Sequence, residues 1–159
     1  MAGLDVGTSF IIGSKSKGDS EIEYTEFRDA FYALKPASPI AAKMLEKGLQ
    51  GKKYYRDTDG SFVILGQDAI EKAVERHDSA SRPMFRGVVS PREKDARRVL
   101  KVILHEVVGQ PSAPGEKLCY SVPAQPVDQE EEQFDIGYHE DVIRADLAEV
   151  GFDAQPINE

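Results

Sequence analysis

The residues most able to do chemistry stand near the start of the sequence, in LDVGTSF (residues 4–10). A short apolar segment is followed there by Gly7, Thr8 and Ser9. The backbone N–H groups and hydroxyls of such a turn can bind an anion, and a glycine lets that anion approach closely. Asp5 would repel a phosphate unless a hydrated divalent cation lay between them, so the pattern predicts a Mg²⁺–phosphate site. A plain hairpin turn would explain the same residues.

Other reactive side chains have simpler interpretations. Cys119 is the single cysteine and lies between apolar neighbours, where a buried small hydrophobic residue is expected rather than a nucleophile. His77, His105 and His139 have neither HExxH nor Cys/His spacing, which favours solvated or helix-face histidines. The phosphate-loop patterns GxGxxG and GxxxxGK[ST] do not occur. We therefore expect no transition metal held by side chains, and none of the nucleotide folds that those loops define.

Length and charge narrow the class of protein. The chain has 159 residues, of which 40% are hydrophobic and 30% charged, and this suits a globular domain with a substantial core. Its formal net charge of −8 opposes binding to nucleic acid or to an anionic membrane surface. No apolar segment approaches the ~20 residues that span a bilayer, and the sequence does not begin like a signal peptide. We expect a cytoplasmic protein with no nucleic-acid partner and no membrane span.

Three strands in succession must position the turn. Residues 3–6 and 10–15 are short apolar segments on either side of it, and residues 21–34 begin with the alternation typical of a strand. Further strands are expected over residues 117–124 and 152–159. With helices between these later strands, the order predicts an α/β fold with a mixed sheet.

The clearest helix signal lies in SPREKDARRVLKVILHEVVGQP, residues 90–111. A capping box formed by Ser90 and Glu93 would start this helix, and Gly109 would end it. An acidic amphipathic helix is expected over residues 127–151. The apolar residues that should face the sheet are Ala96, Val99, Leu100, Ile103, Leu104 and Val107 in the first helix, and Ile136, Ile143, Leu147 and Val150 in the second.

Residues 35–86 differ in character and are expected to form an inserted small subdomain. Prolines punctuate the start, residues 40–47 suit a short helix, and YYRDTDGSFVILG contains an Asp-Gly hairpin turn. A second helix is expected over residues 67–76, with one face made of Ala69, Ile70, Ala73 and Val74. The core subdomain would then comprise residues 1–34 and 87–159.

Five segments, in order, resemble the first half of an actin-like ATPase, the superfamily of actin, bacterial rod-shape actins, seventy-kilodalton heat-shock chaperones and sugar kinases. LDVGTSF resembles the first phosphate motif, and VILGQDAIEKA resembles the segment that closes the inserted lobe. RGVVSPREKDARRVLKVIL resembles the helix that follows, and YSVPAQPVDQEEEQF resembles the "vTVPa" strand and the next helix start. AEVGFDAQPINE resembles the strand that leads onward. These matches span nearly the whole chain.

This resemblance implies a ribonuclease-H-like core sheet, with ATP or ADP and Mg²⁺ bound between two such lobes. It implies that Asp5 holds hydrated Mg²⁺. It also implies that the β- and γ-phosphates contact the turn residues Gly7, Thr8, Ser9 and Phe10.

Two further positions match functional residues of the family. Lys15 corresponds to a phosphate-facing basic residue of some members, with Lys17 or a solvated lysine as alternatives. Glu159 corresponds to the glutamate of the family's "NEP" or "EEP" sequence, which would orient water or Mg²⁺.

The resemblance covers one lobe. The second phosphate motif, DxGG[GT], and the adenosine-binding glycines are absent, and the sequence stops before the helix that should cover the last strand. The first motif also lacks the extra glycine of hexokinase-like members, which favours an actin-like or chaperone-like ATPase over a sugar kinase. We expect the first lobe of a longer or split ATPase, which folds alone but does not turn over ATP.

The sequence and its resemblance are compatible with two functions. One is an ATPase whose lobes close on the nucleotide and couple hydrolysis to filament self-assembly or to a protein partner. The other is an actin-like, nucleotide-binding scaffold with little or no hydrolysis. An intact DxGG[GT] motif in the missing C-terminal lobe would favour the enzyme, and a degraded one would favour the scaffold.

Overall fold

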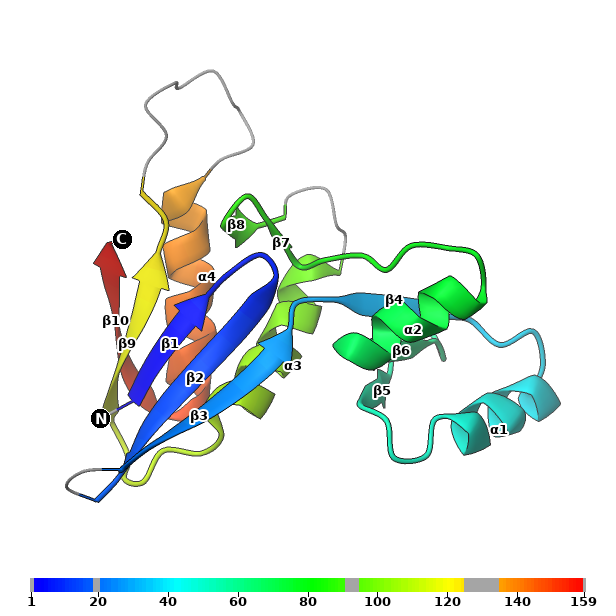
Figure 1. Ribbon diagram of the computed structural model, residues 1–159, viewed down its shortest axis with the longest axis horizontal. Coiled ribbons are helices and arrows are strands. Elements are labelled where there is room, and N and C mark those ends of the chain that lie inside the picture. Colours follow the sequence, from blue (N-terminus) through cyan, green and yellow to red (C-terminus); the bar gives the residue numbers. More distant parts are fainter. Residues whose placement is uncertain (1, 19–20, 91–94, 125–134, 159) are drawn as a thin grey trace. The chain divides into compact units, whose positions relative to one another are not determined.

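The chain folds as two compact units, drawn in Figure 1. The computed structural model describes residues 2–18, 21–90, 95–124 and 135–158. The larger unit comprises Met1–Asp29 and Arg82–Glu159, and the smaller unit comprises Ala30–Ser81. The smaller unit thus interrupts the larger one, from residue 30 rather than the expected 35 and up to residue 81 rather than 86.

A five-stranded mixed sheet forms the centre of the larger unit, in the order β10-β9-β1-β2-β3. β1 pairs antiparallel with β2, and β2 pairs antiparallel with β3. β9 pairs in parallel with β1 on one side and with β10 on the other. The α/β order and the mixed sheet expected from the sequence are confirmed. The five strands are β1 Ala2–Val6, β2 Phe10–Lys17, β3 Glu21–Arg28, β9 Glu116–Val122 and β10 Phe152–Asn158.

Two helices, α3 (Ala96–Val108) and α4 (Ile136–Val150), cover the same face of this sheet (Figure 1). α3 contacts β2 and β3, α4 contacts β10, and the helices contact each other. β1 buries every second side chain beneath this layer, so its intervening residues point to the other face. The buried side chains of β1 are Ala2, Leu4 and Val6.

The apolar face of α3 is confirmed, but its predicted start is wrong. All six residues expected to face the sheet are buried, and Gly109 ends the helix with a φ of 61°. The N-cap is Asp95 rather than Ser90. Ser90 is engaged elsewhere, because its N–H donates to the Pro83 carbonyl at 2.7 Å beside the hairpin of β7 (Met84–Phe85) and β8 (Val88–Val89). Glu93, the other half of the expected capping box, lies outside the described residues.

α4 is described only from Ile136, and the earlier part of the expected helix, residues 127–134, lies outside the described residues. The Asp135 side chain caps it by accepting from the Tyr138 N–H at 2.8 Å. The predicted inward residues Ile143 and Leu147 are fully buried, whereas Ile136 and Val150 are half-buried. His139 is buried as well, so it is a helix-face rather than a solvated histidine.

The smaller unit has a sheet and a core of its own. Its strands pair in the order β4-β6-β5, all antiparallel. Its elements are β4 Phe31–Leu34, α1 Pro39–Gly48, β5 Tyr54–Arg56, β6 Phe62–Leu65 and α2 Gln67–Glu75. The buried core cluster consists of Leu34, Ala42, Leu49, Phe62, Ile64 and Ala69. In the second predicted helix Ala69 and Ala73 are buried, but Val74 is 66% exposed, so its expected place on the inner face is wrong.

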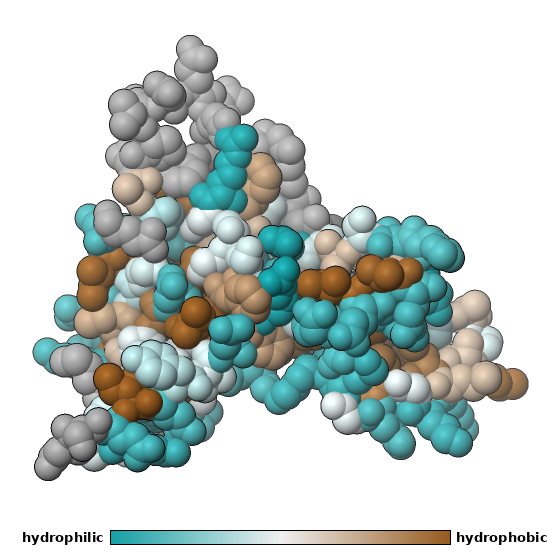
Figure 2. Space-filling view, in the orientation of Figure 1, coloured by the Kyte–Doolittle hydropathy of each residue, from teal (hydrophilic) through white to brown (hydrophobic). Residues whose placement is uncertain are grey.

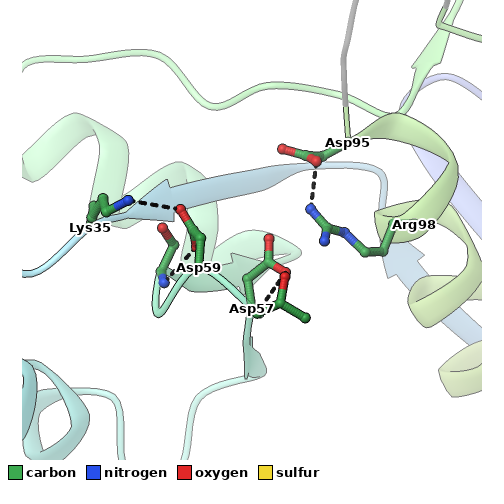
Figure 3. A network of polar contacts seen from close by, with 7 residues as sticks. Lys35, Asp57, Asp59, Asp95 and Arg98 are labelled. Carbon is green, nitrogen blue, oxygen red and sulfur yellow. Dashed lines mark hydrogen bonds and ion pairs between the residues drawn. The ribbon is translucent and has the colours of Figure 1, made fainter.

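The expected Asp-Gly hairpin joins β5 to β6. Gly60 has a φ of 84°, which a glycine adopts without strain. The Asp59 carboxylate accepts from the Ser61 N–H at 2.9 Å and pairs with Lys35 at 3.2 Å, while Asp57 accepts from the Thr58 N–H at 2.6 Å (Figure 3). These contacts of short acidic side chains with the following backbone are typical of tight turns.

None of the helices in the described part of the chain is long and apolar enough to cross a membrane.

The first prediction concerns the close packing of α3 on β2. A Cβ atom added at Gly13 would lie 2.7 Å from Val107 Cγ1 and 2.9 Å from the Val107 carbonyl oxygen. Gly13→Ala should therefore lower the free energy of unfolding by about 1–3 kcal/mol in urea titrations. Gly48→Ala is the matched control, because a Cβ at that helical position meets nothing within 4 Å. The control should gain up to about 1 kcal/mol. Equal effects at both sites would contradict the packing argument.

The second prediction concerns His139. Burial lowers its pKa to about 4, and neither ring nitrogen has a hydrogen-bond partner among the described residues. The unfolded chain takes up this proton below pH ~6.5, whereas the folded protein does so only near pH 4. The contribution of His139 to the free energy of unfolding should therefore fall by about 3 kcal/mol as the pH drops through that interval, whereas the raised pKa of Asp29 contributes in the opposite direction. His139→Leu should remove the His139 contribution, so the difference in unfolding free energy between the two proteins should change with pH in urea titrations from pH 4 to 7. A pH-independent difference would contradict this role of His139.

Candidate functional site

The site begins at the exposed carboxylate of Asp5, near the end of β1. Leu4 pairs with Tyr120 in the parallel register of β1 and β9, so the next residues along, Asp5 and Ser121, lie side by side. The Ser121 hydroxyl donates to Asp5 Oδ1 at 2.9 Å and accepts from the Val6 N–H at 3.1 Å. One carboxylate oxygen is thereby held, and the side chain remains open to solvent.

A tight turn follows β1 and reverses the chain into β2. The Gly7 N–H donates to the Phe10 carbonyl at 3.1 Å. A Cβ atom at Gly7 would lie 2.8 Å from that same oxygen, so a larger residue would force the turn open. The sequence is thus constrained to glycine here by a close backbone approach.

Two carbonyl groups of the turn, those of Thr8 and Ser9, are bonded to the protein. Thr8 O accepts from Arg82 Nη1 at 3.1 Å, and Ser9 O accepts from the Asp29 N–H at 3.0 Å. In contrast, within the described ranges no residue accepts a hydrogen bond from the N–H groups or hydroxyls of Thr8 and Ser9. Thr8 and Ser9 therefore have their carbonyls bonded while their N–H groups and hydroxyls stay available, which is the arrangement that an anion requires.

Two basic side chains that the sequence analysis did not single out lie at this turn. Arg82 contacts Thr8, and the Arg28 guanidinium lies 4.5 Å from the centroid of the Phe10 ring. Both add positive charge near the available N–H groups. They partly offset the negative charge of Asp5, so the surroundings of the turn suit an anion better than Asp5 alone would suggest.

Asp29 supports the same turn from inside the protein. Its side chain is 1% exposed, and Oδ2 accepts from the Met84 N–H at 3.2 Å, while Oδ1 has no hydrogen-bond partner in the part of the chain that the structure describes. Burial raises the pKa of Asp29 to about 7, and the Met84 N–H and the charge of Arg82 oppose this rise only in part. The carboxyl group therefore changes its charge close to neutral pH, on the residue whose backbone N–H holds the Ser9 carbonyl.

The two lysines considered for the phosphate lie elsewhere. Lys15 pairs with Ala2 at the other end of β1, on the helix-covered face, whereas Asp5 points to the opposite face. Its Nζ donates to the Gln110 carbonyl at 2.5 Å. Lys17 lies further along β2 and pairs with Glu23 at 3.0 Å. The expectation of a lysine facing the phosphates is wrong, because β2 runs antiparallel to β1 and carries both residues away from the turn.

Metal ligands are few at this site. The described ranges contain no group of three or more His, Cys, Asp and Glu side chains that could hold a metal ion. A single exposed carboxylate, with one oxygen already hydrogen-bonded to Ser121, fits a hydrated Mg²⁺ that takes its other ligands from water and phosphate. Asp5 is therefore compatible with the expected Mg²⁺. Glu159 lies outside the described residues.

One further sequence interpretation needs correction. Cys119 is half-buried rather than buried, because β9 alternates and its neighbours Leu118 and Tyr120 occupy the inner face. Ser121 could have been found, since it occupies the threonine position of the "vTVPa" motif in YSVPA. Arg82 and Asp29 gave no local signal, because their contacts with the turn join segments distant in the sequence.

Comparison with known proteins gives one family assignment. A family model described as Volactin matches residues 1–159, the whole chain. No curated protein matches the chain. On the strength of this full-length match, the chain belongs to the Volactin family.

Proposed function

We propose that this chain is the first lobe of an actin-like ATPase and binds the phosphates of Mg²⁺–ATP or Mg²⁺–ADP at the turn between β1 and β2. The observation that carries the proposal is the division of hydrogen bonds within the turn. The carbonyls of Thr8 and Ser9 are bonded to protein, while their N–H groups and hydroxyls have no acceptor in the described part of the chain. A plain hairpin does not require this division.

We also propose that the mixed sheet is a ribonuclease-H-like core. Its support is the order of the strands: three antiparallel strands come first, and two parallel strands follow, each preceded by a helix. The resemblance of five sequence segments to actin-like ATPases, in family order, is the second support. The smaller unit would then correspond to the family's inserted lobe.

In this proposal each residue of the site has a separate task. The N–H groups and hydroxyls of Thr8 and Ser9 bind phosphate oxygens, and Gly7 lets them approach. Asp5, held by Ser121, orients the water shell of Mg²⁺. Bound Mg²⁺ would neutralise phosphate charge. Positioning and charge neutralisation supply most of the catalysis in phosphoryl transfer, so few reactive side chains are needed.

The rest of the nucleotide would be bound by a second lobe, and Glu159 would orient water or Mg²⁺. The scaffold function remains the alternative, in which nucleotide binds but is hydrolysed little or not at all. Nucleotide titration together with a phosphate-release assay on the full-length protein separates the two functions. Binding with sustained release supports the ATPase, and binding without release supports the scaffold.

The third prediction tests the role of Asp5. Asp5→Asn should weaken Mg²⁺-dependent ATP binding or turnover of the full-length protein about tenfold or more, because the amide lacks the charge that attracts hydrated Mg²⁺. The amide oxygen can still accept from Ser121, so the thermal midpoint without ligand should hardly change. Asp153→Asn, an exposed aspartate on β10, is the matched control and should leave both quantities unchanged. Loss of stability with an intact nucleotide response would make Asp5 structural.

A protein partner, or a second copy of the chain, is proposed for the smaller unit. On the face drawn in Figure 2, hydrophobic residues of the described chain lie in small areas between hydrophilic ones. On α1, however, Ile40 and Met44 are 73% and 72% exposed and are four residues apart, which places them on one side of the helix. Such exposed pairs are candidates for contact with another molecule.

The fourth prediction concerns this helix face. The double variant Ile40→Gln and Met44→Gln should weaken assembly or partner binding about tenfold, measured by sedimentation, because it removes apolar contact area. Nucleotide affinity in titration calorimetry should stay nearly constant. Glu46→Gln, an exposed polar replacement on the same helix, should affect neither quantity. Equal losses of assembly and nucleotide affinity in the double variant would count against a separate contact surface.

A further inference from the structure

Arg82 makes the one long-range side-chain contact to the carbonyls of the turn among the described residues. Its Nη1 donates to Thr8 O at 3.1 Å, across a separation of 74 residues. Thr8 lies between β1 and β2 and belongs to neither strand, so no ladder hydrogen bond fixes its carbonyl. Among the described residues, Arg82 is therefore the donor that holds this carbonyl.

The contact between Arg82 and the Thr8 carbonyl also affects the Ser9 N–H, which belongs to the same peptide group. A trans peptide is planar, and its C=O and N–H point in opposite directions. The Thr8 carbonyl shares its plane with the Ser9 N–H, so a guanidinium that holds the carbonyl directs this N–H away from itself. No residue in the described ranges accepts a hydrogen bond from this N–H.

The neighbouring peptide is held in a similar way. The Ser9 carbonyl accepts from the Asp29 N–H, and the Asp29 side chain is buried and bonded to the Met84 N–H. Asp29 and Arg82 are the residues at which the chain leaves and re-enters the larger unit. Two consecutive peptide planes of the turn are thus anchored to these two points of the larger unit.

We propose that Arg82 is a positioning residue of the anion site, which fixes the peptide between Thr8 and Ser9 so that the Ser9 N–H faces a bound phosphate. The identity of the anion rests on the function proposed above, whereas the orientation of the peptide does not. The competing explanation is that Arg82 attracts the anion by its charge alone. The two explanations predict different results for the Ser9 N–H without ligand and for anion affinity at high salt.

The fifth prediction compares Arg82→Ala and Arg82→Lys in the full-length protein, with Mg²⁺–pyrophosphate as the calorimetric probe. Arg82→Ala should lower the affinity about fivefold or more, since a hydrogen bond from a charged donor is lost. Arg82→Lys should restore part of the affinity, because an ammonium can donate to the same carbonyl without the planar geometry of the guanidinium. The thermal midpoint without ligand should be similar in all three proteins, since Arg82 is exposed.

Arg144→Ala is the control for loss of one positive charge. Arg144 lies in the same unit, on α4, and makes surface contacts with Glu140 at 3.7 Å and Asp141 at 3.9 Å. This variant should bind Mg²⁺–pyrophosphate like the unchanged protein. Raising the salt to 1 M shortens the screening length to about 3 Å and should remove most effects of charge alone. The loss in Arg82→Ala should persist there, and its disappearance would overturn the positioning role.

A ligand-free measurement separates this inference from the proposed function. In Arg82→Ala the amide resonance of Ser9 should shift in ¹H–¹⁵N spectra, because its peptide plane is released, and it should stay in place in Arg144→Ala. An unchanged Ser9 resonance would overturn the inference, even if pyrophosphate binds. If the unchanged protein binds neither pyrophosphate nor ATP, the proposed function fails, and the Ser9 resonance still decides the role of Arg82.

Discussion

The pairing of β1 with a strand on each side is the constraint on which the site depends. Its parallel register with β9 brings Ser121 beside Asp5, and its antiparallel register with β2 returns the chain through a turn that only glycine fits at residue 7. The alternation of β1 buries Leu4 and Val6 under the helices. It therefore leaves Asp5 on the open face, at the end of the strand where the turn begins.

The turn and Asp5 impose opposite requirements on a ligand. The N–H groups and hydroxyls of Thr8 and Ser9, for which the described residues supply no acceptor, favour an anion, as do the guanidinium groups of Arg28 and Arg82. The exposed carboxylate of Asp5 disfavours an anion and favours a cation. A metal ion with its water shell and a phosphate satisfies both requirements together, whereas either one alone satisfies only half. The charges at the site therefore favour a metal–anion complex over either ion alone, independently of any family resemblance.

Local patterns predicted most of the fold. The presence of the strands, the apolar face of α3 and the Asp-Gly hairpin each involve residues close in sequence, and these predictions are confirmed. The single strand expected over residues 21–34 is wrong, because β3 ends at Arg28, its Ile22 and Tyr24 are exposed, and β4 belongs to the smaller unit. The predicted helix start at Ser90 failed because the β7–β8 hairpin engages that residue.

The site was less predictable than the fold. Asp5 and the turn could be proposed from residue types, but Lys15 was misplaced, since its position depends on strand register and face rather than on spacing along the chain. The contact of Arg82 with Thr8 joins residues 74 positions apart, and no short pattern encodes such a contact. The resemblance to actin-like ATPases stays a prediction.

The smaller unit begins and ends at one place. Phe31 and Ser81 form an isolated antiparallel bridge, with reciprocal N–H···O contacts of 2.9 Å, so the two ends of this unit are fastened to each other. To the rest of the chain the whole unit is therefore a closed loop, whatever its internal length. Because the entropy of closing a loop rises only with the logarithm of its length, doubling the insert would cost only about 0.6 kcal/mol in closure. Evolution could accordingly lengthen, shorten or replace residues 32–80 in relatives at little cost to the sheet that carries the turn.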